Sequence, residues 1–175
     1  VEAVGLSGVD GGILDAVKRP PTKILNDQTG KRELVDFGHV GDITKVDVRL
    51  LKTLLDADYV PVVASLGGDD EGRILNINAD TVASKIAGAL ACEKLILASD
   101  VDGILRGDGT LISRVSIAEA QALIKEGVIK GGMIPKVQGI MDAIKEGVKN
   151  VHIVNGMKPS SLLAEVFTDT FVISP

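Results

Sequence analysis

The fold of this chain is decided by residues 79–98, which read ADTVASKIAGALACEKLILA. Val82, Ile86 and Leu90 recur at the spacing of one helix face, and the Ala and Gly residues between them let a helix pack close to a sheet. Residues 94–98 form a short, continuous apolar run, the pattern of a strand that is covered on both faces. The stretch therefore predicts a helix that leads into a buried strand of a parallel sheet.

The residues before this stretch continue the alternation of strands and helices. Residues 1–6 predict a buried strand that enters a turn, and Asp47 is placed to cap a helix. The apolar residues of that helix recur at helical spacing, at Leu50, Leu51, Leu54 and Leu55. Tyr59–Ala64 then predicts a strand, and the polar residues 69–72 predict the turn of a hairpin.

Two more helices are predicted in the second half of the chain. Ser116 and Glu119 form a capping box, and Gly127 ends the helix that this box begins. Another helix follows Pro135 and ends at Gly147. The residues expected to face the core are Ile117, Ala120, Leu123 and Ile124 in the first helix, and Val137, Ile140, Met141 and Ile144 in the second.

The last predicted elements complete an α/β pattern. A short buried strand is predicted over residues 151–154 and a final helix over residues 160–167. The alternation predicts an α/β fold, a three-layer α/β/α sandwich with a mainly parallel sheet. No long linker, repeat or low-complexity segment divides the chain, so we expect one domain over residues 1–175.

The composition excludes several kinds of partner. The chain has 175 residues, a formal net charge of -5, three Phe, one Tyr and no Trp. Nucleic acid is not expected as a partner, because binding it needs clustered Lys and Arg and aromatic side chains for stacking. A membrane is not expected either, because apolar runs such as 86–92 are far shorter than the roughly 20 residues that span a bilayer. Cys92 is the only cysteine, so no intrachain disulfide can form, and we expect a cytoplasmic location.

Three polar clusters follow predicted strands, at the end of the sheet where parallel sheets bind ligands. The clusters are NINAD (76–80), SDVDGIL (99–105) and GGMIPK (131–136). The chain contains neither G-x-x-x-x-G-K-[ST] nor G-x-G-x-x-G between a strand and a helix, which excludes a P-loop and a dinucleotide fingerprint. Gly131 and Gly132 precede a predicted helix and can offer backbone N–H groups to an anion, with Lys136 one turn inside.

Each candidate residue also has a structural interpretation. Asp80 opens a helix, where a carboxylate is favourable at the positive end of the helix dipole, and Asn76 and Asn78 suit a turn or a cap. Asp100 and Asp102 suit a strand-to-loop turn, and no metal site is predicted because no third oxygen ligand is fixed by spacing. The remaining candidates are interpreted as structural, since none has a recognisable nucleophile or metal partner: His39, His152 and Cys92.

Five motifs occur in order along the chain. They are GLSGVDGG (5–12), GHVG (38–41), NINAD (76–80), SDVDGIL (99–105) and GGMIPK (131–136). Together they closely resemble the acetylglutamate kinases of the amino-acid kinase family, and the resemblance runs from about Val4 to Phe167. It implies a three-layer α/β/α fold that transfers a phosphoryl group from ATP, with Mg²⁺, to the side-chain carboxylate of N-acetyl-L-glutamate in arginine biosynthesis.

The resemblance also implies a role for individual residues. Asn76 would contact the acyl amino acid, Asp80 would hold catalytic lysines in place, and Lys136 would stabilise charge on the transferring phosphoryl group. The residues around the nucleotide would be Asp100, Val101, Asp102, Gly103, Ile104 and Leu105, together with Val128, Ile129 and Lys130. Such chemistry needs cations and positioning but no general base, because a carboxylate with a pKa near ~4 is already ionised at neutral pH.

Two features depart from the family's pattern. The family's full-length members are expected to form homo-oligomers. They begin with a portion that carries a Lys-Gly-Gly strand end, a His-Gly-Gly-Gly loop and a substrate-binding Arg. None of these three features follows Val1. Residues 167–175 read FTDTFVISP in place of the family's closing Gly-Thr strand. We therefore expect the nucleotide-binding part of a kinase, with weak or no turnover as an isolated chain. A related kinase that acts on a carrier-linked aminoadipate, and a non-catalytic module that binds a nucleotide or arginine, are the alternatives.

Overall fold

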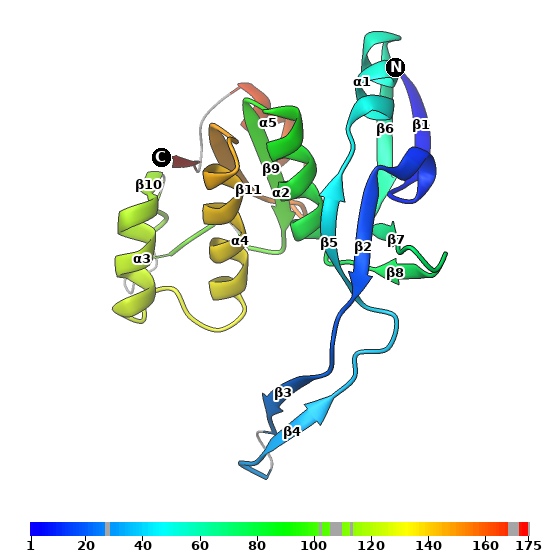
Figure 1. The fold of residues 1–175 in the computed structure, drawn as a ribbon. Coiled ribbons are helices and arrows are strands. Elements are labelled where there is room, and N and C mark those ends of the chain that lie inside the picture. Colours follow the sequence, from blue (N-terminus) through cyan, green and yellow to red (C-terminus); the bar gives the residue numbers. More distant parts are fainter. Residues whose placement is uncertain (27–28, 102, 106–109, 113, 168–171, 175) are drawn as a thin grey trace. The chain divides into compact units, whose positions relative to one another are not determined.

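The structure is a computed structural model, which describes all residues except 27–28, 102, 106–109, 113, 168–171 and 175 (Figure 1). The chain divides into two compact units, Val1–Val82 and Ala83–Pro175. Helices alternate with strands, and parallel strand pairs occur in both units, which confirms the predicted α/β class. No helix in the described part of the chain is long and apolar enough to cross a membrane.

The first unit is built mainly of strands. Its elements are β1 (Glu2–Ser7), η1 (Asp10–Gly12), β2 (Leu14–Lys18), β3 (Thr22–Leu25), β4 (Arg32–Val35), β5 (Gly41–Val46), α1 (Arg49–Asp56), β6 (Tyr59–Ala64), β7 (Leu66–Gly68) and β8 (Ile74–Asn76). β1 and β6 form a parallel pair, and α1 packs on β6. A four-stranded sheet has the order β5-β2-β7-β8, in which β2 pairs antiparallel with β5 and parallel with β7. The strands predicted near the N-terminus and at Tyr59–Ala64 are thus confirmed. The predicted burial of the first strand is wrong, because the residues of β1 are exposed or half-buried.

Polar turns shape the first unit. The predicted hairpin at residues 69–72 is confirmed, because β7 and β8 pair antiparallel and the Asp69 N–H donates to the Arg73 carbonyl over 3.1 Å. The helix predicted after Asp47 is also confirmed, but the residue at its N-cap is Val48. Asp47 lies one residue earlier, where its carboxylate accepts the backbone N–H of Arg49 at 3.0 Å.

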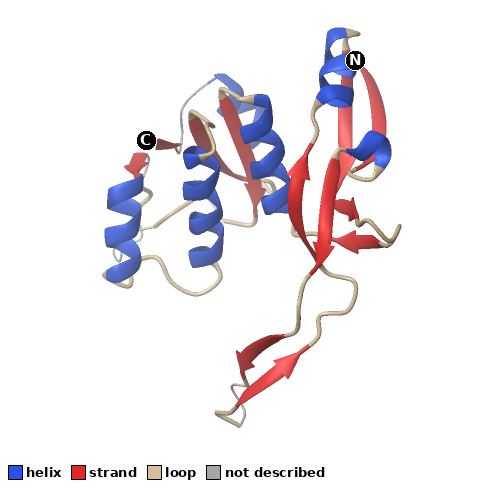
Figure 2. Ribbon diagram, in the orientation of Figure 1, coloured by secondary structure: helices blue, strands red, loops and turns tan. Residues whose placement is uncertain are grey.

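A ribbon that the sequence analysis did not predict extends from the first unit. β2 and β5 lead into β3 and β4, which pair antiparallel with Thr22 opposite Val35 and Leu25 opposite Arg32 (Figure 2). The side chains of β3 are all exposed, and in β4 only Val35 is half-buried. Pairing of the backbones, and not burial of an apolar face, therefore defines this hairpin.

The second unit has a core on one face of a sheet. α2 (Ala79–Leu90) begins in the first unit and continues into this one. The further elements are β9 (Lys94–Ser99), β10 (Arg114–Ser116), α3 (Ile117–Lys125), α4 (Met133–Lys145), β11 (Asn150–Asn155), α5 (Ser161–Phe167) and β12 (Val172–Ser174). The sheet has the order β10-β12-β11-β9, with β9 parallel to β11 and β10 parallel to β12.

Helices cover both faces of this sheet. The buried cluster on one face joins Ala87 of α2, Ala120 of α3 and Val137 of α4 to strand residues that include Leu97 and Ile153. On the other face, α5 packs on β11, where Glu165 is hydrogen-bonded to His152. The second unit is therefore an α/β/α arrangement, as predicted.

The helix ends of the second unit follow local sequence signals. The capping box is confirmed, because the Glu119 N–H donates to Ser116 Oγ at 3.2 Å and the Ser116 N–H donates to the Glu119 carboxylate at 2.8 Å. Gly127 has a positive φ of 73° and ends α3. α4 begins at Met133, two residues before Pro135, since proline is tolerated in the first turn, where no backbone N–H is needed.

Candidate functional site

A cavity of about 440 Å³ lies in the second unit. Its lining comes from two segments that are far apart in the sequence, one after β9 and one between α3 and α4: Gly103, Ile104, Leu105, Gly127, Val128, Ile129, Lys130 and Met133. The walls are mostly aliphatic, and Lys130 supplies a positive charge. Concave, largely apolar sites of this size that carry a few polar groups are typical of small-ligand binding.

The structure thus brings together six of the residues that the sequence analysis assigned to a nucleotide. These are Gly103, Ile104, Leu105, Val128, Ile129 and Lys130. Asp100 is exposed and Val101 is half-buried, and neither is among the lining residues. Asp102 lies outside the described residues. Gly127 and Met133 line the cavity and were not assigned a role from the sequence.

Backbone hydrogen bonds fix both segments of the lining. At the end of α3, the N–H groups of Val128 and Ile129 both donate to the Leu123 carbonyl, at 3.0 and 3.1 Å. Together with the positive φ of Gly127, this is the αL ending that turns a chain sharply away from a helix. In the other segment, the Ile112 N–H donates to the Ile104 carbonyl at 2.9 Å, and the Ile104 side chain is buried. The cavity is therefore formed by ordered backbone.

Lys136 lies in the first turns of α4, at the end of the helix where the backbone N–H groups carry positive partial charge. Its Nζ donates to Ser99 Oγ at 3.2 Å, and Ser99 Oγ in turn lies 3.2 Å from Asp100 Oδ1. Ser99 is the last residue of β9, so this contact places the Lys136 ammonium at the carboxyl end of a parallel strand. Ligands bind at this end in open parallel sheets. The sequence analysis named Ser99 only as part of its cluster.

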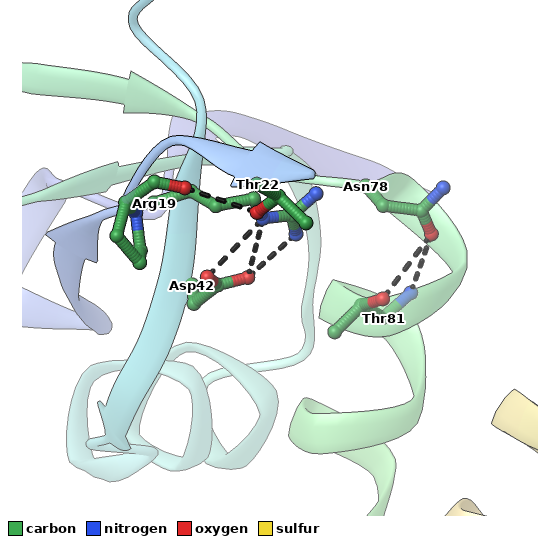
Figure 3. A network of polar contacts seen from close by, with 6 residues as sticks. Arg19, Thr22, Asp42, Asn78 and Thr81 are labelled. Atoms are coloured by element: carbon green, nitrogen blue, oxygen red, sulfur yellow. Dashed lines mark hydrogen bonds and ion pairs between the residues drawn. The ribbon is translucent and has the colours of Figure 1, made fainter. Parts of the chain in front are cut away.

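Asn76 and Asp80 belong to the first unit. Asn76 ends β8, with an exposed side chain, and its backbone N–H donates to the His39 carbonyl at 2.7 Å. Asp80 is half-buried in the first turn of α2. Asn78, between them, accepts the Thr81 N–H at 3.0 Å, as a helix cap does (Figure 3). The cap interpretation of Asn78 is confirmed.

A second polar contact lies in the same region of the first unit. Arg19 Nε donates to both carboxylate oxygens of Asp42, at 3.0 and 3.2 Å (Figure 3). The side-chain hydrogen bonds and the attraction of Asp42 raise the pKa of Arg19 further above its ordinary value. This bidentate pair ties Arg19, the residue after β2, to Asp42 near the start of β5.

The residues that the sequence analysis interpreted as structural are not placed in the cavity. Cys92 is half-buried, and burial raises the pKa of its thiol, so the reactive thiolate is disfavoured. His152 is fully buried and is hydrogen-bonded to Glu165. The two residues are thirteen positions apart in the sequence, and no spacing rule predicted their contact. Within the described residues, no group of three or more His, Cys, Asp or Glu side chains is placed to hold a metal ion.

The fold and the cavity define a class of protein. Parallel strands with helices on both faces, and a cavity beyond the end of β9, are the arrangement of α/β proteins that bind small ligands. Residues 1–155 match the model of the amino acid kinase family. The chain belongs to the amino acid kinase family.

Comparisons with known proteins give three examples of its similarity. The chain is 46% identical over 170 residues to an acetylglutamate kinase from Syntrophobacter fumaroxidans, covering 97% of this chain and 57% of that protein. A structure of N-acetylglutamate synthase from Neisseria gonorrhoeae, complexed with coenzyme A and L-arginine, is 30% identical with a TM-score of 0.80, over 99% of this chain and 38% of that one. The fold is shared with Giardia carbamate kinase, which is 17% identical. The two structures superpose with a TM-score of 0.70 over 99% of this chain and 64% of that one. The chain spans 56% to 58% of the length of the curated relatives that it matches.

Proposed function

We propose that this chain is the nucleotide-binding part of an acetylglutamate kinase, which phosphorylates the side-chain carboxylate of N-acetyl-L-glutamate with ATP in arginine biosynthesis. The observation that carries the proposal is the cavity, because two distant segments that the family resemblance assigned to the nucleotide line it together. The 46% identity to an acetylglutamate kinase over 97% of the chain supports this choice of substrate.

The cavity suits the nucleoside end of ATP. Leu105, Val128 and Met133, which are exposed or half-buried, offer apolar surface to a base, and backbone groups of the two segments offer hydrogen bonds. Lys130, at the edge of the lining, adds a charge that attracts phosphate. In this proposal the base and ribose occupy the cavity, and the phosphates extend toward the start of α4.

The phosphoryl group would be transferred beside Lys136. Transfer between phosphate and carboxylate oxygens needs in-line positioning and positive charge over the equatorial oxygens, while the acceptor needs no deprotonation. Lys136 would neutralise the γ-phosphate with help from the α4 N-terminus. Asp80 would orient the catalytic lysine, and Asn76, with its exposed carboxamide, would hold the acyl amino acid.

Mg²⁺ would enter with the nucleotide. This ion keeps several waters and is usually bound by substrate phosphates together with one or two carboxylates. Asp100, an exposed carboxylate next to Ser99 at the end of β9, is an oxygen donor of the kind that the ion accepts. The ion would neutralise charge on the phosphates. As a biosynthetic kinase that uses ATP, the protein is proposed to work in the cytoplasm and, with the whole sequence of its relatives, as a homo-oligomer.

Calorimetry tests the proposal. We expect the chain to bind ADP with Mg²⁺ at one site, and Lys136→Ala to weaken the binding of the ATP analogue AMP-PNP at least tenfold, because a cation is lost beside the terminal phosphates. Lys145→Ala is the matched control, since Lys145 lies on the same helix and pairs with Asp142 at the surface. Absence of ADP binding, or equal effects of the two substitutions, would contradict the proposal.

The chemistry is tested with MgATP and N-acetyl-L-glutamate, by trapping the acyl phosphate as its hydroxamate. We expect weak or no product from this chain alone. A longer form that carries the family's N-terminal portion should produce the hydroxamate, and Lys136→Ala should lower its rate about 10² to 10³-fold, as the loss of one electrostatic contact does. An acceptor preference for a carrier-linked aminoadipate would favour the related kinase instead.

Arginine binding is a second candidate function. The 30% identical synthase structure contains L-arginine, and that chain matches 99% of this one. Titration with arginine separates the two functions. Binding of arginine without any binding of ADP would favour a non-catalytic arginine-binding module over a kinase.

A further inference from the structure

A serine hydroxyl lies between an ammonium group and a carboxylate at the end of β9. Lys136 Nζ donates to Ser99 Oγ at 3.2 Å, and Ser99 Oγ lies 3.2 Å from Asp100 Oδ1. All three residues belong to the second unit. Ser99 and Lys136 are half-buried, and Asp100 is exposed.

The position of Ser99 is fixed by its backbone. It is opposite Asn155 in the parallel pairing of β9 with β11, and its carbonyl accepts the Gly156 N–H at 2.8 Å. The hydroxyl is therefore carried by a strand that is held on the next strand, whereas Lys136 reaches it through a flexible four-carbon chain.

The direction of the hydrogen bonds follows from the groups involved. A hydroxyl has one proton to donate and two lone pairs to accept with, an ammonium group can only donate, and a carboxylate can only accept. When the Ser99 hydroxyl donates its hydrogen bond to Asp100, its lone pairs face Lys136. Asp100 thereby orients the hydroxyl, and the negative charge of Asp100 strengthens the bond that the hydroxyl accepts.

We propose that Ser99 is a positioning residue that, with its hydroxyl oriented by Asp100, holds the Lys136 ammonium at the carboxyl end of β9, ready for the terminal phosphate of the nucleotide. The inference rests on the proposed kinase function. To that function it adds a residue that helps to restrict the side chain of Lys136 before the nucleotide binds. Restricting a flexible cation in advance reduces the ordering that must accompany binding.

One experiment measures the position of Lys136 without any nucleotide. The acylation rate of individual lysines by a water-soluble N-hydroxysuccinimide ester is followed by mass spectrometry in the unchanged chain and in Ser99→Ala. We expect Lys136 to react two- to fivefold faster in Ser99→Ala, because its amine loses the hydrogen bond to the serine hydroxyl, and Lys145 to react at the same rate in both. Ser99→Thr, which keeps the hydroxyl and suits the end of a strand, should restore the slow rate.

A second experiment measures the consequence for binding. By calorimetry, Ser99→Ala should weaken AMP-PNP binding about five- to tenfold, which is the size of effect expected from the loss of one ordinary hydrogen bond. AMP, which lacks the terminal phosphates, should bind Ser99→Ala within twofold of the unchanged chain. Ser99→Thr should bind both nucleotides like the unchanged chain.

The outcomes separate the inference from the proposed function. If the unchanged chain binds neither AMP nor AMP-PNP, the kinase function fails, and the role of Ser99 fails with it. If both nucleotides bind and Lys136→Ala weakens AMP-PNP, but Ser99→Ala changes neither that affinity nor the Lys136 acylation rate, the kinase function stands and the positioning role of Ser99 is overturned.

Discussion

His152 Nδ1 is hydrogen-bonded to Glu165 Oε1, and both side chains are buried, with exposed fractions of 0% and 2%. The pair joins the middle of β11 to α5, on the sheet face opposite the apolar cluster. Lys94 Nζ donates to the Glu165 carbonyl at 3.2 Å, so β9 also holds this helix. In α5 the polar side chain of Glu165 is buried, whereas the large apolar side chains are exposed: Leu162, Leu163, Val166 and Phe167. The polar contact therefore determines which face of the helix lies on the sheet.

Glu165→Ala should strongly destabilise the second unit. Removing one member of a buried hydrogen-bonded pair leaves the other without its partner, which costs about 3 kcal/mol or more. Urea denaturation measures the free energy of unfolding. Lys145→Ala, which breaks the exposed Lys145–Asp142 pair, is the control and should change the free energy by no more than ~0.5 kcal/mol. Equal effects of the two substitutions would show that the buried pair contributes little.

Gly8→Ala should destabilise the first unit, whereas Gly5→Ala should not. A Cβ atom on Gly8 would overlap the Leu66 carbonyl oxygen and lie 2.7 Å from Leu14 Cγ, and neither group is at the end of a flexible side chain. A Cβ on Gly5 meets no atom within 4 Å. Forcing a methyl group into packed surroundings costs roughly 1 to 3 kcal/mol. Thermal melting of the two variants, compared side by side, checks the prediction, which fails if both melt like the unchanged chain.

Ser116→Ala should destabilise α3 by about 1 kcal/mol, since the capping box loses the hydroxyl that accepts the Glu119 N–H. Ser116→Asp should retain most of the stability, because a carboxylate oxygen can accept the same N–H. The free energy of unfolding in urea gives both values. A Ser116→Asp variant as unstable as Ser116→Ala would mean that the hydroxyl does not act as a cap.

The Asp47 carboxyl should titrate at a pH well below its ordinary range. Hydrogen bonds from the Arg49 side chain and backbone lower its pKa from 3.8 to about 2. Because the pKa is lower in the folded than in the unfolded chain, this interaction stabilises the fold above about pH 3.8, and the stabilisation is lost as the pH falls through 2.

Carbon NMR of the Asp47 carboxyl measures the titration midpoint. Arg49→Ala should raise it toward the ordinary value, because both the guanidinium donor and its charge are removed. An unshifted midpoint in the unchanged chain would show that Arg49 does not hold the carboxylate in solution.

Periodicity and caps predicted the helices of both units and the strands β1, β6, β9 and β11, but not β2, β5 or β10. Tyr59–Ala64 and the helix that begins at Ala79 were found where the sequence placed them, because apolar spacing and local caps act within a few residues. β12 was not predicted, because only three residues form it and its pairing with β10 and β11 defines it as a strand. The hairpin β3–β4 was missed for a similar reason, since its exposed side chains carry no alternating pattern.

The candidate site was predictable in part. Glycine positions and motif order indicated the segments that meet around the cavity. The roles of Asp100 at the nucleotide, Asp80 beside the catalytic lysines and Asn76 at the acyl amino acid stay predictions. The contact of Lys136 with Ser99 could not be predicted, because it depends on which rotamer a long side chain adopts on α4 and on the end of a distant strand. The same holds for Glu165 and His152, whose contact arises only when α5 packs on β11.

The exposed ribbon of β3 and β4 has a practical consequence. Because almost none of its side chains is buried, residues can be added at its turn without opening either apolar core. An affinity tag or a fluorophore inserted there would label the protein at an internal position of the chain. The same exposure makes Lys31 and Arg32 accessible to trypsin in the native chain.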